Sequence, residues 1–213
     1  MSKSLGSLRD DHSDFNRNQE QFLYSDPFLA FSTWFDLAVS SGENEANAMV
    51  IATVNSSLQP TTRVVYLKEL IDQTFVFYTN YESAKGKDLA IHPKASILFF
   101  WPGLERQIRI EGEVQKVPDV QSDAYFASRP RESQLGAWVS QQSVTLESMS
   151  ELNNRFELYD KKFPSVVPRP PHWGGYSLFP RRFEFWQGKS SRLHERVVFE
   201  KKQNNWTKFR LNP

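Results

Sequence analysis

The sequence predicts a mostly β fold, a barrel with helices on its periphery. Five segments typical of strands follow one another between residues 48 and 117, and four more lie between residues 175 and 211. With 213 residues and 14% aromatic side chains, the chain can bury a full core. The last segment of the first group alternates, with Ile108, Ile110 and Val114 on one side and Arg109, Glu111, Glu113 and Gln115 on the other. Such alternation indicates an antiparallel sheet with one face in water.

The N-terminal region predicts an arm followed by a helix. Residues 1–26 are rich in polar residues without a sustained period, so we expect a mobile arm that orders on binding. Asp26-Pro27 predicts a helix start, and Phe28, Phe31, Phe35 and Val39 recur at helical spacing. We expect residues 27–213 to form a single domain.

The first group of predicted strands covers residues 48–54, 62–67, 75–79, 95–101 and 107–117. Between the third and fourth strands, residues 83–91 predict a helix that ends before Pro93. After Pro118 the pattern becomes helical, with helices expected over residues 119–128, 133–138 and 146–163.

Residues 164–171 contain four prolines and predict a loop within the domain. Strands then resume over residues 175–179, 182–187, 194–201 and 206–211, and we expect them to complete the same sheet.

Composition excludes several functional classes. Because 26 basic residues nearly balance 25 acidic ones, no global field attracts nucleic acid or an anionic membrane. The longest apolar run, residues 97–101, is too short to span a bilayer, and residues 1–14 are polar and charged. We therefore expect a protein that is neither exported by an obvious signal nor embedded in a membrane. The absence of cysteine fits a reducing compartment, so we expect a cytoplasmic protein. The four histidines show no metal-ligand spacing, and neither a Gly-rich nucleotide loop nor a serine-hydrolase elbow is present.

The pentapeptide of residues 192–196 carries the strongest functional signal. On an extended strand, alternation would aim Arg192, His194 and Arg196 at the same side. Guanidinium groups bind phosphorylated anions, and a histidine titrates near neutral pH, so this face suits a phosphorylated aromatic ligand. The alternative is a solvated basic edge strand of a hairpin.

Two further segments supply cations and hydroxyls. Residues 63–68 carry Arg63 and Lys68 at their ends; on one strand these point to opposite faces, and the alternative is a core strand with polar ends. Tyr78 and Thr79 precede Lys85, which lies near a predicted helix N-terminus that favours an anion. Ordinary helix capping is the alternative there.

Tyr125, Arg129 and Ser133 are spaced by four residues around Pro130. Proline disfavours helical geometry at the preceding residue, so we expect a helix end, a turn and a second helix start. Two hydroxyls, a guanidinium and the N–H groups of the second helix suit a phosphate. A plain surface turn is the alternative. Gln107, Gln142 and Ser143 are weaker candidates that suit the edge of a heterocycle.

Taken together, these blocks resemble the pyridoxine (pyridoxamine) 5'-phosphate oxidase family. The resemblance runs from about Ala48 to Pro213 and is carried by residues 47–49, 63–68, 77–80, 104–107, 128–138, 173–175, 184–188, 192–196 and 210–213.

The resemblance implies an FMN-binding split β-barrel that forms homodimers with FMN at the subunit interface. It also implies oxidation of pyridoxine or pyridoxamine 5'-phosphate to pyridoxal 5'-phosphate by O2, which releases H2O2. The implied FMN contacts are Arg63, Val64, Val65, Tyr66, Leu67, Lys68, Tyr78, Thr79, Lys85, Gln107, Gln142, Ser143, Trp186 and Arg196. The implied substrate contacts are Lys68, Tyr125, Arg129, Ser133, Arg192, Leu193, His194 and Arg9, with Arg192 and His194 in the catalytic roles and no metal.

The chain departs from the family pattern at two places. Ala84 stands where an arginine is common directly before the FMN lysine, which removes one cation from the phosphate site. In the arm, Arg9 matches the family, whereas His12 stands where a tyrosine is common. Two alternatives remain: a flavin oxidase of the same fold acting on another heterocycle, as in phenazine synthesis, and a non-catalytic carrier of pyridoxal phosphate or FMN.

Overall fold

A computed structural model describes residue 15 and residues 21–213. The described chain divides into two compact units. The first contains the described residues up to Ala46 together with residues 98–110 and 182–213, and the second contains residues 47–97 and 111–181. Three strands run from one unit into the other: β5 (Lys94–Trp101), β6 (Arg106–Lys116) and β7 (Trp173–Gln187).

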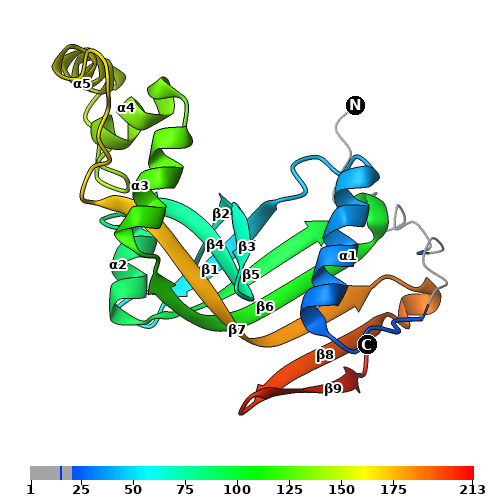
Figure 1. Ribbon diagram of the computed structural model, residues 1–213. Helices are drawn as coiled ribbons and strands as arrows, with labels where there is room; N and C mark the ends of the chain where they lie inside the picture. Colours follow the sequence, from blue (N-terminus) through cyan, green and yellow to red (C-terminus); the bar gives the residue numbers. More distant parts are fainter. Residues whose placement is uncertain (1–14, 16–20) are drawn as a thin grey trace. The chain divides into compact units, whose positions relative to one another are not determined.

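The strands of residues 48–187 lie in one sheet with the order β2-β1-β5-β6-β7-β4-β3. The strands not yet given are β1 (Ala48–Val54), β2 (Pro60–Tyr66), β3 (Glu69–Ile71) and β4 (Thr74–Asn80). Within the second unit, Figure 1 shows the helices on the periphery of the strands. The predicted mostly β architecture is confirmed. Strand β3 was not predicted, because three residues are too few to produce a pattern.

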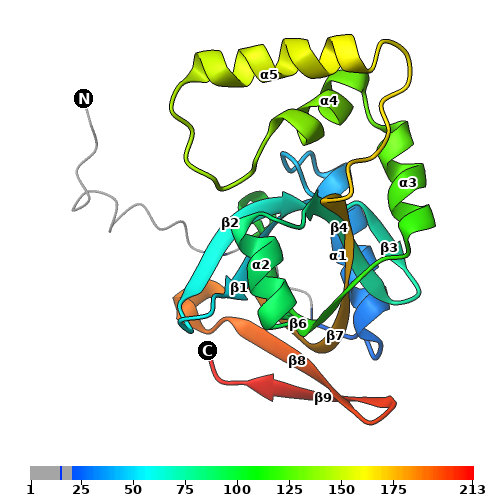
Figure 2. The same ribbon diagram turned by 90° about the vertical axis from the view of Figure 1, so that its left-hand side faces the viewer.

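Four helices belong to the second unit: α2 (Ala84–Ile91), α3 (Asp119–Ser128), α4 (Arg131–Val139) and α5 (Met149–Lys162). Helix α5 lies beside α4 (Figure 2), and Arg131 Nη2 donates to the carbonyl of Phe163 at 2.7 Å. A cluster of buried residues, Phe126, Leu135, Val167 and Trp173, joins α3 and α4 to the start of β7. This cluster fixes the turn between the two helices.

In the first unit, α1 (Pro27–Ser40) begins as predicted. Asp26 Oδ1 accepts from the backbone N–H groups of Phe28 and Leu29, at 2.9 and 2.8 Å. Of the predicted face, Phe31 is buried and Phe28 and Phe35 are half-buried, whereas Val39 is 57% exposed. The other buried residues of the helix are Pro27, Ala30, Trp34 and Ala38. The predicted face is therefore correct as far as Phe35 and wrong at Val39.

The C-terminal part of the first unit is a hairpin of β8 (Glu195–Lys202) and β9 (Asn205–Leu211), paired to the end of β7. The two strands predicted at residues 175–179 and 182–187 form one continuous strand, β7. Pro180 does not interrupt it, because β7 pairs with β4 before this residue and with β8 after it. Two short 3-10 helices, Pro102–Leu104 and Ser190–Arg192, complete the elements of residues 21–213. Within residues 21–213, no helix has the length and apolar character needed to cross a membrane.

Gly112 in β6 permits a close approach of two strands, which gives a first prediction. A Cβ atom at this position would lie 2.2 Å from the carbonyl oxygen of Phe179. We expect Gly112→Ala to lower the free energy of unfolding by about 1 to 3 kcal/mol, measured by denaturant titration. Gly136→Ala in α4 is the matched control, since a Cβ there meets no atom within 4 Å. That control should stabilise by about 0.5 to 1 kcal/mol, and equal effects of the two changes would contradict the packing argument.

Candidate active site

A cavity of about 930 Å³ lies in the second unit. It brings together most of the residues singled out in the sequence, namely Arg63, Val64, Val65, Tyr66, Lys68, Tyr78, Thr79, Lys85, Tyr125, Arg129, Ser133, Gln142 and Ser143. Leu67 is in the core, 7% exposed, and is not part of the lining. The expectation that Arg63 and Lys68 serve opposite faces is wrong, because β2 ends at Tyr66 and both residues line this one cavity.

Strand β2 gives the cavity an apolar surface between cations. Val64 and Tyr66 lie on the exposed side of the strand and are 60% and 38% exposed, whereas Val65 between them is 8% exposed. Lys68 Nζ lies 5.0 Å from the centre of the Tyr66 ring. An apolar strip of this kind suits the face of a planar ring.

Lys85 is a buried cation held by neutral partners. Its Nζ donates to Thr79 Oγ1 at 3.0 Å, Ser83 Oγ at 3.2 Å and Gln142 Oε1 at 2.8 Å. Among the described residues, no carboxylate lies within ion-pair distance of Lys85. Burial, with a smaller effect from the nearby Arg63, lowers the pKa of Lys85 to about 8. A buried ammonium without a counter-ion is poised to receive an anion.

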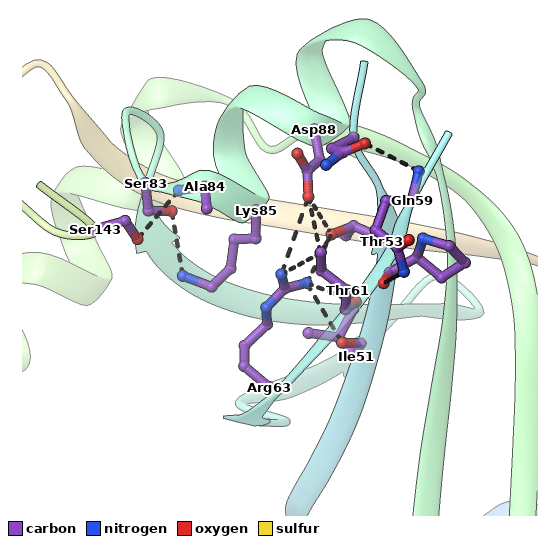
Figure 3. Close-up of polar contacts among 12 residues, drawn as sticks. Ile51, Thr53, Gln59, Thr61, Arg63, Ser83, Ala84, Lys85, Asp88 and Ser143 are labelled. Carbon is purple, nitrogen blue, oxygen red and sulfur yellow. Dashed lines mark hydrogen bonds and ion pairs between the residues drawn. The ribbon is translucent and has the colours of Figure 1, made fainter. Parts of the chain in front are cut away.

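The N-terminus of α2 lies next to Lys85. Ser83 caps this helix, because its Oγ accepts from Gly86 N at 3.3 Å. The N–H of Ala84 donates to Ser143 Oγ at 3.2 Å, which brings residues 59 positions apart together (Figure 3). Ordinary capping and an anion site therefore coexist at this helix start.

Arg63 supplies a second cation at this end of the cavity. Its Nη1 donates to Thr53 Oγ1 and its Nη2 to Thr61 Oγ1, both at 2.6 Å (Figure 3). The carboxylate of Asp88 lies 3.9 Å from Nη2. Burial lowers the pKa of Arg63, and Asp88 partly offsets that effect.

A second group of polar residues surrounds the junction of α3 and α4. Arg129 follows α3 in extended geometry, with φ −74° and ψ 150°, and Ser133 lies in the first turn of α4. The predicted arrangement of helix end, turn and helix start is therefore confirmed. The Arg129 guanidinium lies 4.6 Å from the Trp173 ring centre, and its buried Nη1 has no hydrogen-bond partner among the described residues. Such an orphan donor calls for an acceptor.

Three stacked aromatic rings, those of Tyr78, Tyr125 and Trp173, line the cavity beside Arg129. The rings of Tyr78 and Tyr125 stack at 3.8 Å with an angle of 7° between their planes, and Tyr78 lies 5.6 Å from Trp173. The Tyr78 hydroxyl donates to Glu69 Oε1 at 2.7 Å, and burial together with this carboxylate raises the pKa of Tyr78. The remaining oxygen of Glu69 accepts from Gln121 Nε2 at 3.0 Å.

Sequence reasoning missed Glu69, Gln121 and Trp173 as parts of this site. Two signals could have drawn attention to them: the position of Glu69 directly after Lys68, and that of Trp173 in the block 173–175 that carries the family resemblance.

The other candidates lie in the first unit and are not part of the cavity lining; they are Gln107, Trp186, Arg192, Leu193, His194 and Arg196. The sequence predicted an extended strand at Arg192, and this is wrong. Arg192 instead ends a 3-10 helix, with φ +60°. Strand β8 begins only at Glu195, so simple alternation does not align Arg192 with His194. Arg9 lies outside the described residues.

His194 is held in a defined orientation. Its ring lies 4.7 Å from the Trp186 ring, and its Nδ1 accepts from the backbone N–H of Lys189 at 3.2 Å. The neutral ring therefore carries its proton on Nε2. Burial, with the charge of Arg192 as a second cause, lowers the pKa of His194.

Arg196 forms a buried ion cluster with Glu184. Its Nε and Nη2 donate to Glu184 Oε1 at 2.9 and 2.8 Å, while Arg109 Nη2 donates to Oε2 at 2.5 Å. These arginines together hold the pKa of the Glu184 carboxyl below its usual value, although burial acts in the opposite direction. The cluster fixes Arg196 at the start of β8.

Comparisons with known proteins agree with this geometry. Residues 37–160 match the family described as pyridoxamine 5'-phosphate oxidase, and residues 173–213 match the pyridoxine 5'-phosphate oxidase C-terminal dimerisation region. A pyridoxine/pyridoxamine 5'-phosphate oxidase of Bordetella pertussis is 49% identical over 211 residues, 99% of this chain and 100% of the relative. One from Leptospira biflexa is 50% identical over 189 residues, 88% of this chain and 89% of the relative.

Two solved structures are similar in fold. PhzG from Burkholderia lata, in complex with tetrahydrophenazine-1-carboxylic acid, superposes with a TM-score of 0.86 at 27% identity, covering 92% of this chain and all (100%) of that one. A pyridoxamine 5'-phosphate oxidase-related, FMN-binding protein from Nostoc punctiforme gives a TM-score of 0.71 at 18% identity, covering 90% and 100%.

The fold and the site together define a split-barrel protein with a cation-lined cavity. The identity over nearly the whole chain then gives the family. The chain belongs to the pyridoxamine 5'-phosphate oxidase family and is an oxidoreductase of that family.

Proposed function

We propose that the protein is an FMN-dependent oxidase that converts pyridoxine and pyridoxamine 5'-phosphate to pyridoxal 5'-phosphate, with O2 as acceptor and H2O2 as product. The observation that carries this proposal is one cavity lined by four cations, which we assign to two groups, Arg63 with Lys85 and Lys68 with Arg129. A cofactor phosphate and a substrate phosphate each require such a group. We further propose that it acts as a cytoplasmic homodimer with FMN at the subunit interface, which the match to the dimerisation region supports.

The described residues fit both phosphorylated ligands. Lys85 is buried without a carboxylate partner, and Arg129 has a buried Nη1 without an acceptor. The apolar strip of Val64 and Tyr66 suits the face of the flavin. A bound FMN would supply the acceptor for a hydride from the substrate and the path for electrons to O2.

The side chains would bind the two phosphorylated ligands, orient the pyridine ring and hold or release a proton. We assign the FMN phosphate to Arg63, Thr79, Lys85 and Ser143, and the remaining FMN contacts to Tyr78, Gln107, Gln142, Trp186, Arg196 and the segment Val64, Val65, Tyr66, Leu67 and Lys68. We assign the substrate phosphate to Lys68, Tyr125, Arg129 and Ser133. Arg192 and Leu193 would orient the pyridine ring, and His194 would hold or release a proton at Nε2.

The resemblance to PhzG gives a second candidate, oxidation of a reduced phenazine precursor. Product analysis separates the possibilities. The FMN-loaded protein should form pyridoxal 5'-phosphate and H2O2 from pyridoxine 5'-phosphate, and should not oxidise tetrahydrophenazine-1-carboxylic acid. The opposite result would favour the phenazine reaction, and turnover of neither compound would favour a carrier.

The lowered pKa of Lys85 predicts a pH dependence of FMN binding. The pKa of about 8 means that Lys85 carries its charge below this pH and loses it above. Because the doubly charged FMN phosphate binds the charged lysine, its affinity should be highest near neutral pH, between the phosphate pKa of about 6 and the pKa of Lys85, and should fall by up to about tenfold per pH unit above pH 8. Titration with FMN and with riboflavin, which lacks the phosphate, tests this.

Riboflavin affinity should stay flat over the same pH range. Lys85→Met should remove the pH dependence, whereas Lys87→Met, which changes an exposed lysine of the same helix, should preserve it. A flat FMN profile in the unchanged protein would contradict the role of Lys85.

Replacing Ala84 by arginine is expected to raise the affinity for FMN. This residue lines the cavity at the first position of α2. An arginine there adds a cation to the proposed phosphate site, so Ala84→Arg should tighten FMN binding by about tenfold, the lower end of a charge-assisted hydrogen bond. Ala90→Arg adds the same charge to an exposed position of the same helix outside the cavity lining. Equal tightening by both variants would indicate a general charge effect instead.

A further inference from the structure

Asp88 connects three elements around Arg63. It lies on α2 and is 6% exposed, while Thr53 on β1 is 1% exposed and faces Thr61 on β2 in the strand register. A single oxygen, Asp88 Oδ2, accepts from Thr53 Oγ1 at 2.6 Å and from Thr61 Oγ1 at 3.1 Å. Figure 3 shows the two threonines between the carboxylate and the guanidinium.

The carboxylate sets the direction of both hydroxyl groups. A threonine hydroxyl has one proton and two lone pairs, and an ionised carboxylate can only accept. Because both protons point to Asp88, both oxygens present lone pairs to Arg63, which donates to each at 2.6 Å. Nη1 also lies 3.3 Å from the carbonyl oxygen of Thr61. Arg63 is therefore fixed at both terminal nitrogens.

This arrangement leaves part of the guanidinium available. The direct distance from Arg63 Nη2 to Asp88 is 3.9 Å, too long for a hydrogen bond. Among the described residues, Arg63 Nε has no hydrogen-bond partner, and the side chain lines the cavity. The carboxylate thus orients Arg63 through the threonines without occupying all of its donors.

We propose that Asp88 is a positioning residue that holds Arg63, through Thr53 and Thr61, in the orientation that binds the phosphate of FMN. This rests on the proposed function. The opposite possibility is that Asp88 competes with the phosphate for Arg63. The two differ in sign, because removal of a competing negative charge must tighten anion binding, whereas removal of a positioning group must weaken it.

Binding of FMN and of riboflavin to three proteins tests the proposal. Asp88→Ala should weaken FMN binding about tenfold, the size of one charge-assisted hydrogen bond, and leave riboflavin binding unchanged. Asp88→Asn should stay near the unchanged protein, because its amide oxygen can still accept both hydroxyl protons. In an Arg63→Ala background, Asp88→Ala should have no further effect on FMN binding.

A second pair of variants keeps the test decisive where Asp88→Ala does not fold. Thr61→Val removes one hydroxyl at nearly constant shape and should weaken FMN binding, whereas Thr61→Ser keeps the hydroxyl and should restore it. Tighter or unchanged FMN binding in Asp88→Ala or Thr61→Val would overturn the inference. A purely structural role would weaken FMN and riboflavin binding alike and would also overturn it.

The unchanged protein separates this inference from the proposed function. If it binds FMN no better than riboflavin, the phosphate site itself is refuted, and the role of Asp88 falls with it. If it prefers FMN and the variants keep that preference, only the role of Asp88 is refuted.

Discussion

Arg192→Ala is expected to lower kcat for pyridoxine 5'-phosphate by about 100-fold or more while FMN stays bound, as for loss of a group that aligns the reacting atoms. Arg192 ends a short helix beside His194 and is exposed, so its removal disturbs little of the core. Steady-state kinetics and the flavin content of the purified variant measure the two effects separately.

Arg181→Ala is the control for this change, since Arg181 is an exposed arginine outside every candidate set, paired with Glu113. It should keep full activity. Normal turnover in Arg192→Ala would remove Arg192 from the reaction, and loss of the flavin in that variant would assign it to cofactor binding instead.

Arg129→Ala should raise KM for the phosphorylated substrate by about 10- to 100-fold, with a much smaller change in kcat. The buried Nη1 of Arg129 has no partner among the described residues, and its guanidinium is supported by Trp173. Under the proposed assignment, loss of this charge removes a substrate phosphate contact that is present before and during the reaction, so the effect belongs in KM.

Arg131→Ala is a close control. Arg131 lies two residues further on, but it donates to Phe163 and Asp160 around the end of α5 and does not line the cavity. Its loss should lower the unfolding free energy and leave KM unchanged. An unchanged KM in Arg129→Ala, or an equal rise in both variants, would contradict the assignment of the substrate phosphate.

The local sequence pattern correctly predicted those elements that depend on a single rule, such as helix capping, proline geometry or strand alternation. The helix start at Asp26-Pro27 and the turn at Arg129-Pro130 follow from capping and from proline geometry, and both are confirmed. The buried side of β6, with Ile108 and Ile110 fully buried, follows from alternation.

The rest depends on contacts that are distant in sequence. Continuity of β7 through Pro180 depends on which strands pair on either side of it. The left-handed conformation of Arg192, with φ +60°, overrides the alternation assumed for residues 192–196. Glu69 acquires its place in the site only because β3 lies beside β4 and brings it to Tyr78.

Reduction of the bound flavin without oxygen tests the central claim most directly. Pyridoxine 5'-phosphate is added to the FMN-loaded protein under anaerobic conditions, while the absorption band of the oxidised flavin is recorded. The account predicts that the band bleaches, that pyridoxal 5'-phosphate forms in equal amount to the flavin reduced, and that the band returns when air is admitted. A flavin-loaded protein whose band does not change on adding this substrate would contradict it.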